Sequence, residues 1–246
     1  MAYSIQLYTV RNAIDADLPG TIKRLADIGF TQVEPYNFVA TADVLGEALR
    51  ANGISAPSGH APLLRADQDQ IFAAANVLGI SMVIDPAVAE DRWKNVADIE
   101  ATANLLNAAA KKGAEYGVTV GYHNHWWEFE TFPDGRTGLE VLADRLDPEV
   151  ILELDTYWAS VGGQDPAALL ARLGDRVRLI HIKDGPATRD PRAQVAVGAG
   201  SLPVWDIIDA ASALDVGVIE LDDFDGEMFD AVTDSFRYLA AGRVAA

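Results

Sequence analysis

The sequence lacks cysteine, carries little positive charge and has no long hydrophobic run. Without cysteine, neither a disulfide framework nor a zinc site with thiolate ligands can form. Lys and Arg number 19 against 37 Asp and Glu, which gives a formal net charge of −18. Such a surface repels phosphate backbones and anionic membranes, so we expect neither nucleic acid nor a membrane as a partner. No apolar run approaches the roughly 18 residues of a membrane span, and the first residues lack a signal-peptide pattern, so we expect a soluble, cytoplasmic protein.

Short apolar runs alternate with longer segments that have apolar residues at helical spacing. This alternation predicts parallel strands joined by crossover helices. Because no GxGxxG motif follows a run, a dinucleotide-binding fold is disfavoured. We therefore expect an α/β fold, a (β/α)8 TIM barrel formed by residues 1–246 as a single domain. The eight expected strands are 4–7, 32–36, 54–59, 81–85, 118–122, 150–155, 177–182 and 216–221.

Polar side chains recur at the carboxyl ends of the expected strands, where a TIM barrel carries its active site. Asp155, His181 and Glu220 belong to three consecutive strands and can converge at the mouth of the barrel. Burying such groups is costly unless they are paired or bound to a metal. Carboxylates and imidazoles without sulfur suit Mn²⁺, Mg²⁺ or Co²⁺, with Zn²⁺ also possible. These residues predict one divalent ion, with Mn²⁺ favoured and a fourth ligand from strand five; separate hydrogen-bonded core groups are the alternative.

Residues two apart on a strand share a face, which adds neighbours to this site. The pairs are His123 with His125, Glu153 with Asp155, His181 with Lys183, and Glu220 with Asp222. Lys183 could polarise a substrate oxygen or act as an acid. Alternatively, it forms an ion pair with Glu153 or Asp184.

Four segments carry a resemblance to a known family: GYHNHWWEFE (121–130), LELDTYW (152–158), LIHIKDG (179–185) and VIELDD (218–223). They resemble the xylose isomerase-like barrels, often described as sugar phosphate isomerases or epimerases. In such enzymes a glutamate, an aspartate, a histidine and a glutamate from strands five to eight hold one divalent ion. The resemblance implies Asp155, His181 and Glu220 as ligands. His123 stands where the strand-five glutamate would be, and Glu128 is a second candidate if its loop folds back.

This difference at strand five bears on the reaction that the resemblance implies. In the related ketose epimerases, two glutamates act from opposite faces of the sugar, one removing a proton next to the carbonyl and the other returning it. With histidine at the first position, His125 or Glu153 could replace the missing base, or one face has no base. A single base beside a metal suits an aldose–ketose proton shift or a β-elimination. The candidate catalytic residues are Glu220, His123, Lys183, Glu153 and His125.

Further residues near the strand ends are candidates for substrate binding, together with Lys183. Gln6 and Glu34 lie where sugar hydroxyls would bind, although they could equally fill the barrel with satisfied hydrogen bonds. His60, in SGHAP, resembles the family's pocket histidine. Trp126 and Trp158 could stack on a sugar ring or pack over the barrel rim.

The sequence therefore predicts a metal-dependent isomerase or epimerase that removes a proton next to the carbonyl of an unphosphorylated sugar or keto-sugar. The nearest alternative is a lyase or dehydratase that performs β-elimination on a keto-sugar or keto-glycoside. A third is a non-catalytic sugar-binding barrel or partner subunit. The resemblance also implies a possible homo-oligomer, a dimer or tetramer.

Three further hypotheses are weaker. The GAGSLP segment (198–203) could offer backbone N–H groups to a phosphate, but a glycine pair often only shapes a loop. An endonuclease of abasic DNA is disfavoured by the net charge and by the presence of only four histidines. An amidohydrolase is disfavoured because its HxH pair belongs on the first strand, which here carries Gln6.

Overall fold

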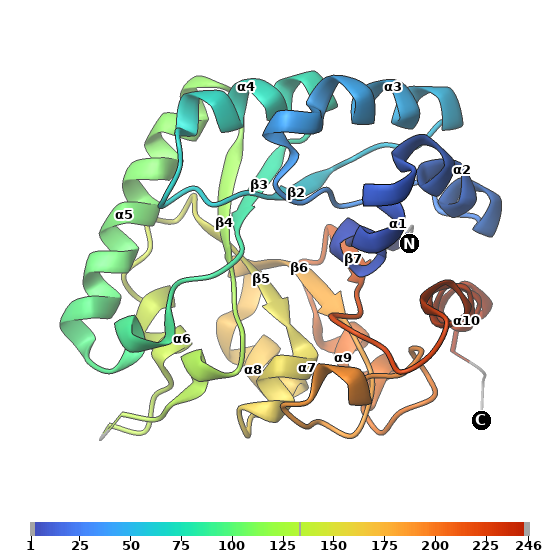
Figure 1. Cartoon of the computed structure of the whole chain (residues 1–246). Coiled ribbons are helices and arrows are strands. Elements are labelled where there is room, and N and C mark those ends of the chain that lie inside the picture. Colours follow the sequence, from blue (N-terminus) through green and yellow to red (C-terminus); the bar gives the residue numbers. More distant parts are fainter. Residues whose placement is uncertain (1–2, 133, 244–246) are drawn as a thin grey trace.

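The computed structural model describes residues 3–132 and 134–243, and it has the expected α/β barrel architecture. Within this part of the chain, seven parallel strands form one sheet in the order β1-β7-β6-β5-β4-β3-β2. Helices form an outer layer around the strands (Figure 1). The strands are β1 (Tyr3–Ile5), β2 (Ser58–His60), β3 (Met82–Asp85), β4 (Thr119–His123), β5 (Ile151–Asp155), β6 (Val177–Ile182) and β7 (Val216–Ile219).

Helices follow the strands as the alternating pattern predicts. Short 3-10 turns begin several of the connections that lead from the strands. The α-helices are α1 (Arg11–Ala16), α2 (Leu18–Ile28), α3 (Ala42–Asn52), α4 (Gln68–Leu78), α5 (Val96–Glu115), α6 (Gly138–Ala143), α7 (Thr156–Val161), α8 (Pro166–Leu173), α9 (Val204–Ala210) and α10 (Met228–Ala241). The 3-10 helices are η1 (Leu7–Val10), η2 (Phe38–Thr41), η3 (Glu90–Trp93), η4 (Trp127–Phe129), η5 (Gly174–Arg176) and η6 (Pro191–Ala193). None of the described helices combines the length and the apolar character that a membrane crossing requires.

The second expected strand, 32–36, is not a regular strand in the structure. It lies between β1 and β2, where single bridges join Glu34 to Gln6 and Tyr36 to His60. Pro35 explains the interruption, because its carbonyl accepts from His60 N–H at 2.7 Å but proline has no N–H to donate. The segment nevertheless connects the two edge strands, so the ring of eight chain segments is complete.

The inside of the ring has an apolar floor below the polar strand ends. Alternate residues of the strands, including Leu179 and Val218, pack in a cluster separate from the main core. Their outward-facing neighbours, such as Ile180, belong instead to the core beneath the helices. Gly121 leaves room for this floor, because a Cβ there would lie 2.5 Å from Ile84 Cδ1. Along β5, β6 and β7, the next inward-facing positions are those of the candidate site.

Candidate metal centre and active site

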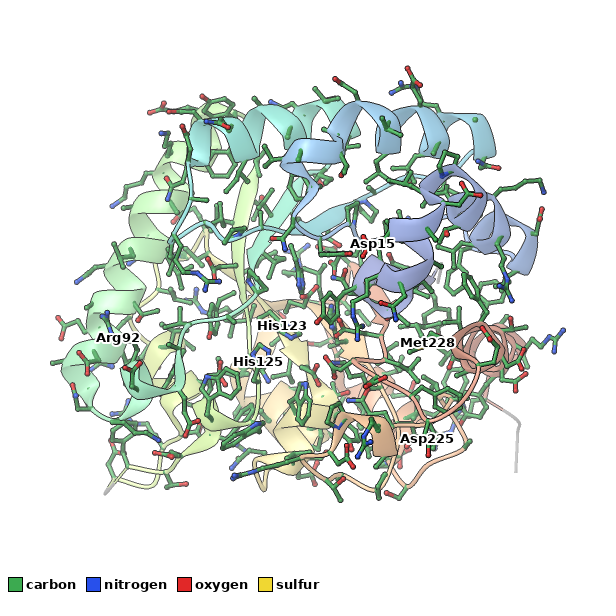
Figure 2. All side chains as sticks on the ribbon, viewed as in Figure 1. Asp15, Arg92, His123, His125, Asp225 and Met228 are labelled. Carbon is green, nitrogen blue, oxygen red and sulfur yellow. The ribbon has the colours of Figure 1, made fainter. Side chains whose placement is uncertain are left out.

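The predicted ligands lie at the carboxyl ends of four strands and converge inside the ring. Figure 2 shows His123 and its neighbour His125 near the centre of the molecule. All members of the set are buried, and each offers one ligand atom within 4.8 Å of the others. We call this set the Glu220 group: His123, Asp155, His181 and Glu220.

The spacing and chemistry of the Glu220 group fit a divalent ion. His181 Nδ1 lies 2.6 Å from Glu220 Oε2, and His123 Nε2 lies 3.7 Å from Asp155 Oδ2. Asp155 Oδ2 is buried and makes no hydrogen bond among the described residues, although Lys183 Nζ lies 2.9 Å away as an ion-pair partner. This oxygen therefore has a lone pair that a metal ion could accept. Two imidazoles and two carboxylates suit the divalent ions expected from the sequence. Metal binding by these four residues stays a prediction.

Glu128, the second candidate for the strand-five ligand, lies outside this cluster. Its carboxylate is buried and accepts hydrogen bonds from Tyr122 OH at 2.7 Å and from the His125 N–H at 2.9 Å. Among the described residues, the possible metal-binding groups include His123 and do not include Glu128. The geometry therefore favours His123 as the ligand at this position.

Lys183 lies among three carboxylates, two of which belong to the Glu220 group. Its Nζ is 2.9 Å from Asp155 Oδ2, 2.7 Å from Glu220 Oε2 and 2.7 Å from Asp222 Oδ2. The sequence analysis considered Glu153 or Asp184 as the ion-pair partner of Lys183. Both residues are wrong, because the partners are Asp155, Glu220 and Asp222. Although burial lowers the pKa of Lys183, the three carboxylates raise it well above its usual value, so the side chain is a cation.

Burial and charge divide the site into protonated and unprotonated groups. Burial raises the pKa of Asp155 to about 6. Burial also acts to raise the pKa of Glu220, but Lys183 and His181 lower it well below its usual value. For His181, burial is outweighed by Glu153 and Glu220, which raise its pKa well above the ordinary value. A divalent ion would therefore have to displace a proton from His181.

The pKa of His123 moves in the opposite direction. Burial and the neighbouring charge of His181 lower it to about 3, so the ring is neutral at physiological pH. Burial is the main reason that the pKa of His125 also lies well below its usual value. Neutral imidazoles can offer a lone pair to a metal ion or to a proton.

A cavity of about 270 Å³ opens above the centre. His60, His123, His125 and Glu220 line it, as expected from their places at strand ends. The remaining lining residues are Tyr8, Tyr36, Asn37, Pro86, Ala87 and Asp222. Of these, Asp222 was already expected on the face of Glu220 from strand alternation. Tyr36 could have been found by extending the strand-end rule, because it ends the expected strand 32–36.

Five of the six residues predicted to bind substrate do not line this cavity: Gln6, Glu34, Trp126, Trp158 and Lys183. Gln6 and Glu34 are fully buried, and Gln6 Nε2 donates to Glu34 Oε1 at 2.9 Å. The same Glu34 oxygen lies 2.9 Å from His181 Nε2, so Glu34 contacts the candidate metal ligands from within the barrel. Trp126 packs against the Arg189 guanidinium, whose Cζ lies 3.5 Å from the centroid of the Trp126 ring. Trp158 is buried, 5.6 Å from Lys183 Nζ. The packing alternative accounts for the position of both tryptophans, because neither lines the cavity.

A model of the family described as xylose isomerase-like TIM barrel matches residues 22–241. The chain belongs to this family. An inosose dehydratase of Geobacillus kaustophilus is 32% identical over 118 residues, which is 46% of this chain and 37% of that protein. The match thus spans little more than a third of that curated relative's length.

Two solved structures show the same fold as this xylose isomerase-like barrel. A sugar phosphate isomerase/epimerase from Parabacteroides distasonis ATCC 8503 has a TM-score of 0.85 at 24% identity, covering 98% of this chain and 94% of that one. The IolI protein with a binding zinc atom has a TM-score of 0.78 at 14% identity, covering 98% of this chain and 97% of that one. The relatives thus include proteins named as sugar isomerases or epimerases and as a dehydratase.

The GAGSLP loop of this barrel is already occupied by a side chain. The Asp184 carboxylate accepts backbone N–H groups from Gly198 and Gly200 at 3.0 Å and from Leu202 at 3.1 Å. It also accepts from Gly185 N–H at 2.8 Å. Because the donors that could bind a phosphate point at Asp184, the loop is held as a structural element, and the phosphate-binding hypothesis loses its support.

Glu128 gives this barrel a measurable pH dependence. Burial raises its pKa from 4.5 to about 8, so between these values the folded protein binds a proton that the unfolded chain has released. The free energy of unfolding therefore falls as pH rises through this window, by up to about 1.4 kcal/mol per pH unit for one proton. We expect Glu128→Gln to remove this contribution and flatten the decline.

The comparison requires urea unfolding of both proteins at several pH values from 5 to 8, with chelator present. Glu115→Gln is the matched control, because Glu115 is exposed near the end of α5. The prediction is wrong if Glu128→Gln and Glu115→Gln give the same pH slope.

Proposed function

We propose that this protein removes a proton next to the carbonyl of an unphosphorylated keto-sugar and then expels a β-hydroxyl as water. The observation that carries the proposal is the distribution of carboxylates around the cavity. Glu220 and Asp222 follow β7, whereas β2, β3 and β4, across the ring, contribute imidazoles and uncharged residues to the lining. One face of a bound sugar would meet a carboxylate base, and the other would not.

The Glu220 group provides a fitting donor set for one divalent ion, with Mn²⁺ favoured among Mn²⁺, Mg²⁺, Co²⁺ and Zn²⁺. Bound there, the ion would stabilise the negative charge that develops on the substrate oxygen when the proton leaves. His123, Asp155 and His181 would hold it, and Glu220 would join them at the edge of the cavity.

Glu220 is the proposed base and Lys183 the proposed acid. Although burial acts to lower the pKa of Lys183, the neighbouring carboxylates hold it well above its usual value, and the charge of a divalent ion in the Glu220 group would lower it toward the range of a proton donor. The lowered pKa of Glu220 keeps it ionised, and its carboxylate borders the cavity. Lys183 Nζ lies 2.7 Å from both Glu220 and Asp222, and Asp222 also lines the cavity. In the elimination, Glu220 takes the proton from the carbon, the carbon–oxygen bond of the β-hydroxyl breaks, and Lys183, acting through Asp222, returns a proton to the departing oxygen.

Two observations support an unphosphorylated, uncharged substrate. The loop that could bind a phosphate donates its N–H groups to Asp184. Carboxylates also outnumber cations around the cavity, because Glu220 and Asp222 line it and its described lining includes no lysine or arginine. Inosose, named in the curated relative, is a cyclic ketone with free hydroxyls and is the first substrate to test.

Isomerisation or epimerisation is the second candidate, and His125 is the observation that favours it. His125 lines the cavity across from Glu220, and its Nδ1 is buried without a hydrogen-bond partner among the described residues. A neutral imidazole at this position could exchange a proton with the opposite face of the sugar.

Product mass distinguishes the candidates. With Mn²⁺ and inosose in deuterated water, elimination gives a product lighter by one water, and we expect this result. Isomerisation or epimerisation conserves the mass of the skeleton but exchanges the proton next to the carbonyl for deuterium. If neither change occurs with any keto-sugar, and the purified protein has no affinity for divalent ions, the chain is a sugar-binding barrel instead.

A further inference from the structure

A second set of four possible ligands overlaps the Glu220 group. Its ligand atoms also lie within 4.8 Å of one another, and all four side chains are buried. It differs in composition, with three imidazoles and one carboxylate in place of two of each. We call this set the Glu153 group: His60, His123, Glu153 and His181.

One oxygen of Glu153 gathers the three imidazoles. Glu153 Oε2 lies 2.5 Å from His60 Nε2, 3.1 Å from His123 Nδ1 and 3.1 Å from His181 Nε2. The other oxygen, Oε1, is buried and has no hydrogen-bond partner among the described residues. An unsatisfied buried carboxylate oxygen is costly, and a cation bound by this carboxylate and the three imidazoles would offset that cost.

The two groups use opposite nitrogens of the histidines that they share. His181 turns Nε2 toward Glu34 Oε1 at 2.9 Å and Glu153 Oε2 at 3.1 Å, whereas its Nδ1 lies 2.6 Å from Glu220 Oε2. His123 turns Nδ1 toward Glu153, whereas its Nε2 lies 3.7 Å from Asp155 Oδ2. A neutral imidazole has one nitrogen with a lone pair and one that carries a proton. Neither ring can therefore serve both positions at once, which makes them alternatives for one ion.

The surroundings of the two groups also differ. Lys183 lies within 2.9 Å of a carboxylate oxygen of both Asp155 and Glu220, so these oxygens already have a cationic neighbour. Among the described residues, the ion pairs of Glu153 are with histidines alone. A nitrogen-rich ligand set with one carboxylate suits Zn²⁺, whereas oxygen-rich sets suit Mn²⁺ and Mg²⁺.

We propose that the Glu153 group is an alternative binding site for a divalent transition-metal ion, which Zn²⁺ occupies in preference to the Glu220 group. Mn²⁺ and Mg²⁺ occupy the Glu220 group. Zn²⁺ in the Glu153 group directs the lone pairs of His123 and His181 away from Asp155 and Glu220. The identity of the bound metal would therefore regulate the activity of the site. This regulation rests on the proposed function, whereas metal binding by the Glu153 group does not.

Metal affinity in matched variants tests the proposal. Zn²⁺ and Mn²⁺ are titrated separately into metal-free protein against a chromophoric chelator at constant pH. We expect His60→Gln and Glu153→Gln to weaken Zn²⁺ binding by at least about tenfold and Mn²⁺ binding by less than about threefold. Asp155→Asn is the matched comparison. In this variant we expect the affinity for Mn²⁺ to fall more than the affinity for Zn²⁺.

Two results of these titrations would overturn the proposal. One is unchanged Zn²⁺ affinity in His60→Gln. The other is an equal loss for both ions in Glu153→Gln, which would mean that Glu153 only orients the shared histidines. Circular dichroism of each metal-free variant reports whether it folds.

A measurement on the unaltered protein does not depend on the folding of a variant. The chain has four histidines, so ¹⁵N-histidine NMR can follow each ring with Zn²⁺ or with Mg²⁺, which are both diamagnetic. We expect His181 to bind Zn²⁺ through Nε2 and to carry its proton on Nε2 with Mg²⁺. The same protonation pattern with both ions contradicts the proposal. Because neither experiment requires turnover, failure here is distinct from failure of the proposed elimination, which product mass reports.

Discussion

Glu220→Gln is expected to abolish turnover while leaving the fold intact. The substitution removes a metal ligand of the Glu220 group and the proposed base in one step. The loss of a positioned base alone slows a reaction by about 10²–10⁴-fold, so we expect kcat/KM to fall by at least about 10³-fold. The amide is close in size to the carboxylate and can still accept a hydrogen bond from Lys183, so the barrel should fold.

The control for this prediction is Glu227→Gln, the same substitution seven residues along the chain. Glu227 is exposed before α10, where its side chain makes no capping hydrogen bond, and activity should be unchanged. Turnover of inosose or another accepted keto-sugar is measured at saturating Mn²⁺, with circular dichroism as the check on folding. A Glu220→Gln variant that retains full activity would remove Glu220 from the mechanism.

Lys183→Met is expected to lower the free energy of unfolding of the metal-free protein strongly. Lys183 is 1% exposed, and its Nζ lies within 3 Å of three carboxylates, from Asp155, Glu220 and Asp222. Removing one partner from a buried ionic cluster leaves uncompensated charge, which costs about 3–5 kcal/mol. A divalent ion in the Glu220 group supplies replacement charge, so saturating Mn²⁺ should reduce the loss.

Urea unfolding with chelator, and then with Mn²⁺, measures both effects. Lys23→Met is the matched control, because Lys23 pairs with Asp27 on the exposed surface of α2 and should change stability by about 0.5 kcal/mol or less. If the metal-free Lys183 and Lys23 variants unfold at the same urea concentration, the cation is not needed to neutralise the cluster. If Mn²⁺ restores nothing, the ion binds elsewhere.

The barrel and the approximate place of the site were predictable because they follow from local patterns. The alternation of apolar runs with helical spacing repeats along the chain, and parallel strands bring their carboxyl ends to one edge. These two facts suffice to bring His123, Asp155, His181 and Glu220 together. The rule failed at 32–36, where Pro35 removes a donor from the ladder and leaves isolated bridges.

Other features of the site depend on contacts that no local pattern specifies. Glu153 was grouped with Asp155 by alternation, yet its three imidazole neighbours come from β2, β4 and β6. Gln6 and Glu34 were candidates for substrate, but closure of the ring brings them within 2.9 Å of each other and away from the cavity.

The sequence by itself therefore determined the fold class, the edge of the barrel that carries the chemistry and the residue types available for a metal ion. These follow from the period of the strands and from the cost of burying polar groups. Only the tertiary structure decided which atoms face one another. Lys183 joins Asp155, Glu220 and Asp222 rather than Asp184, and each shared histidine turns a different nitrogen to each group. The reason is that such distances depend on how the whole ring closes, across residues far apart in the chain.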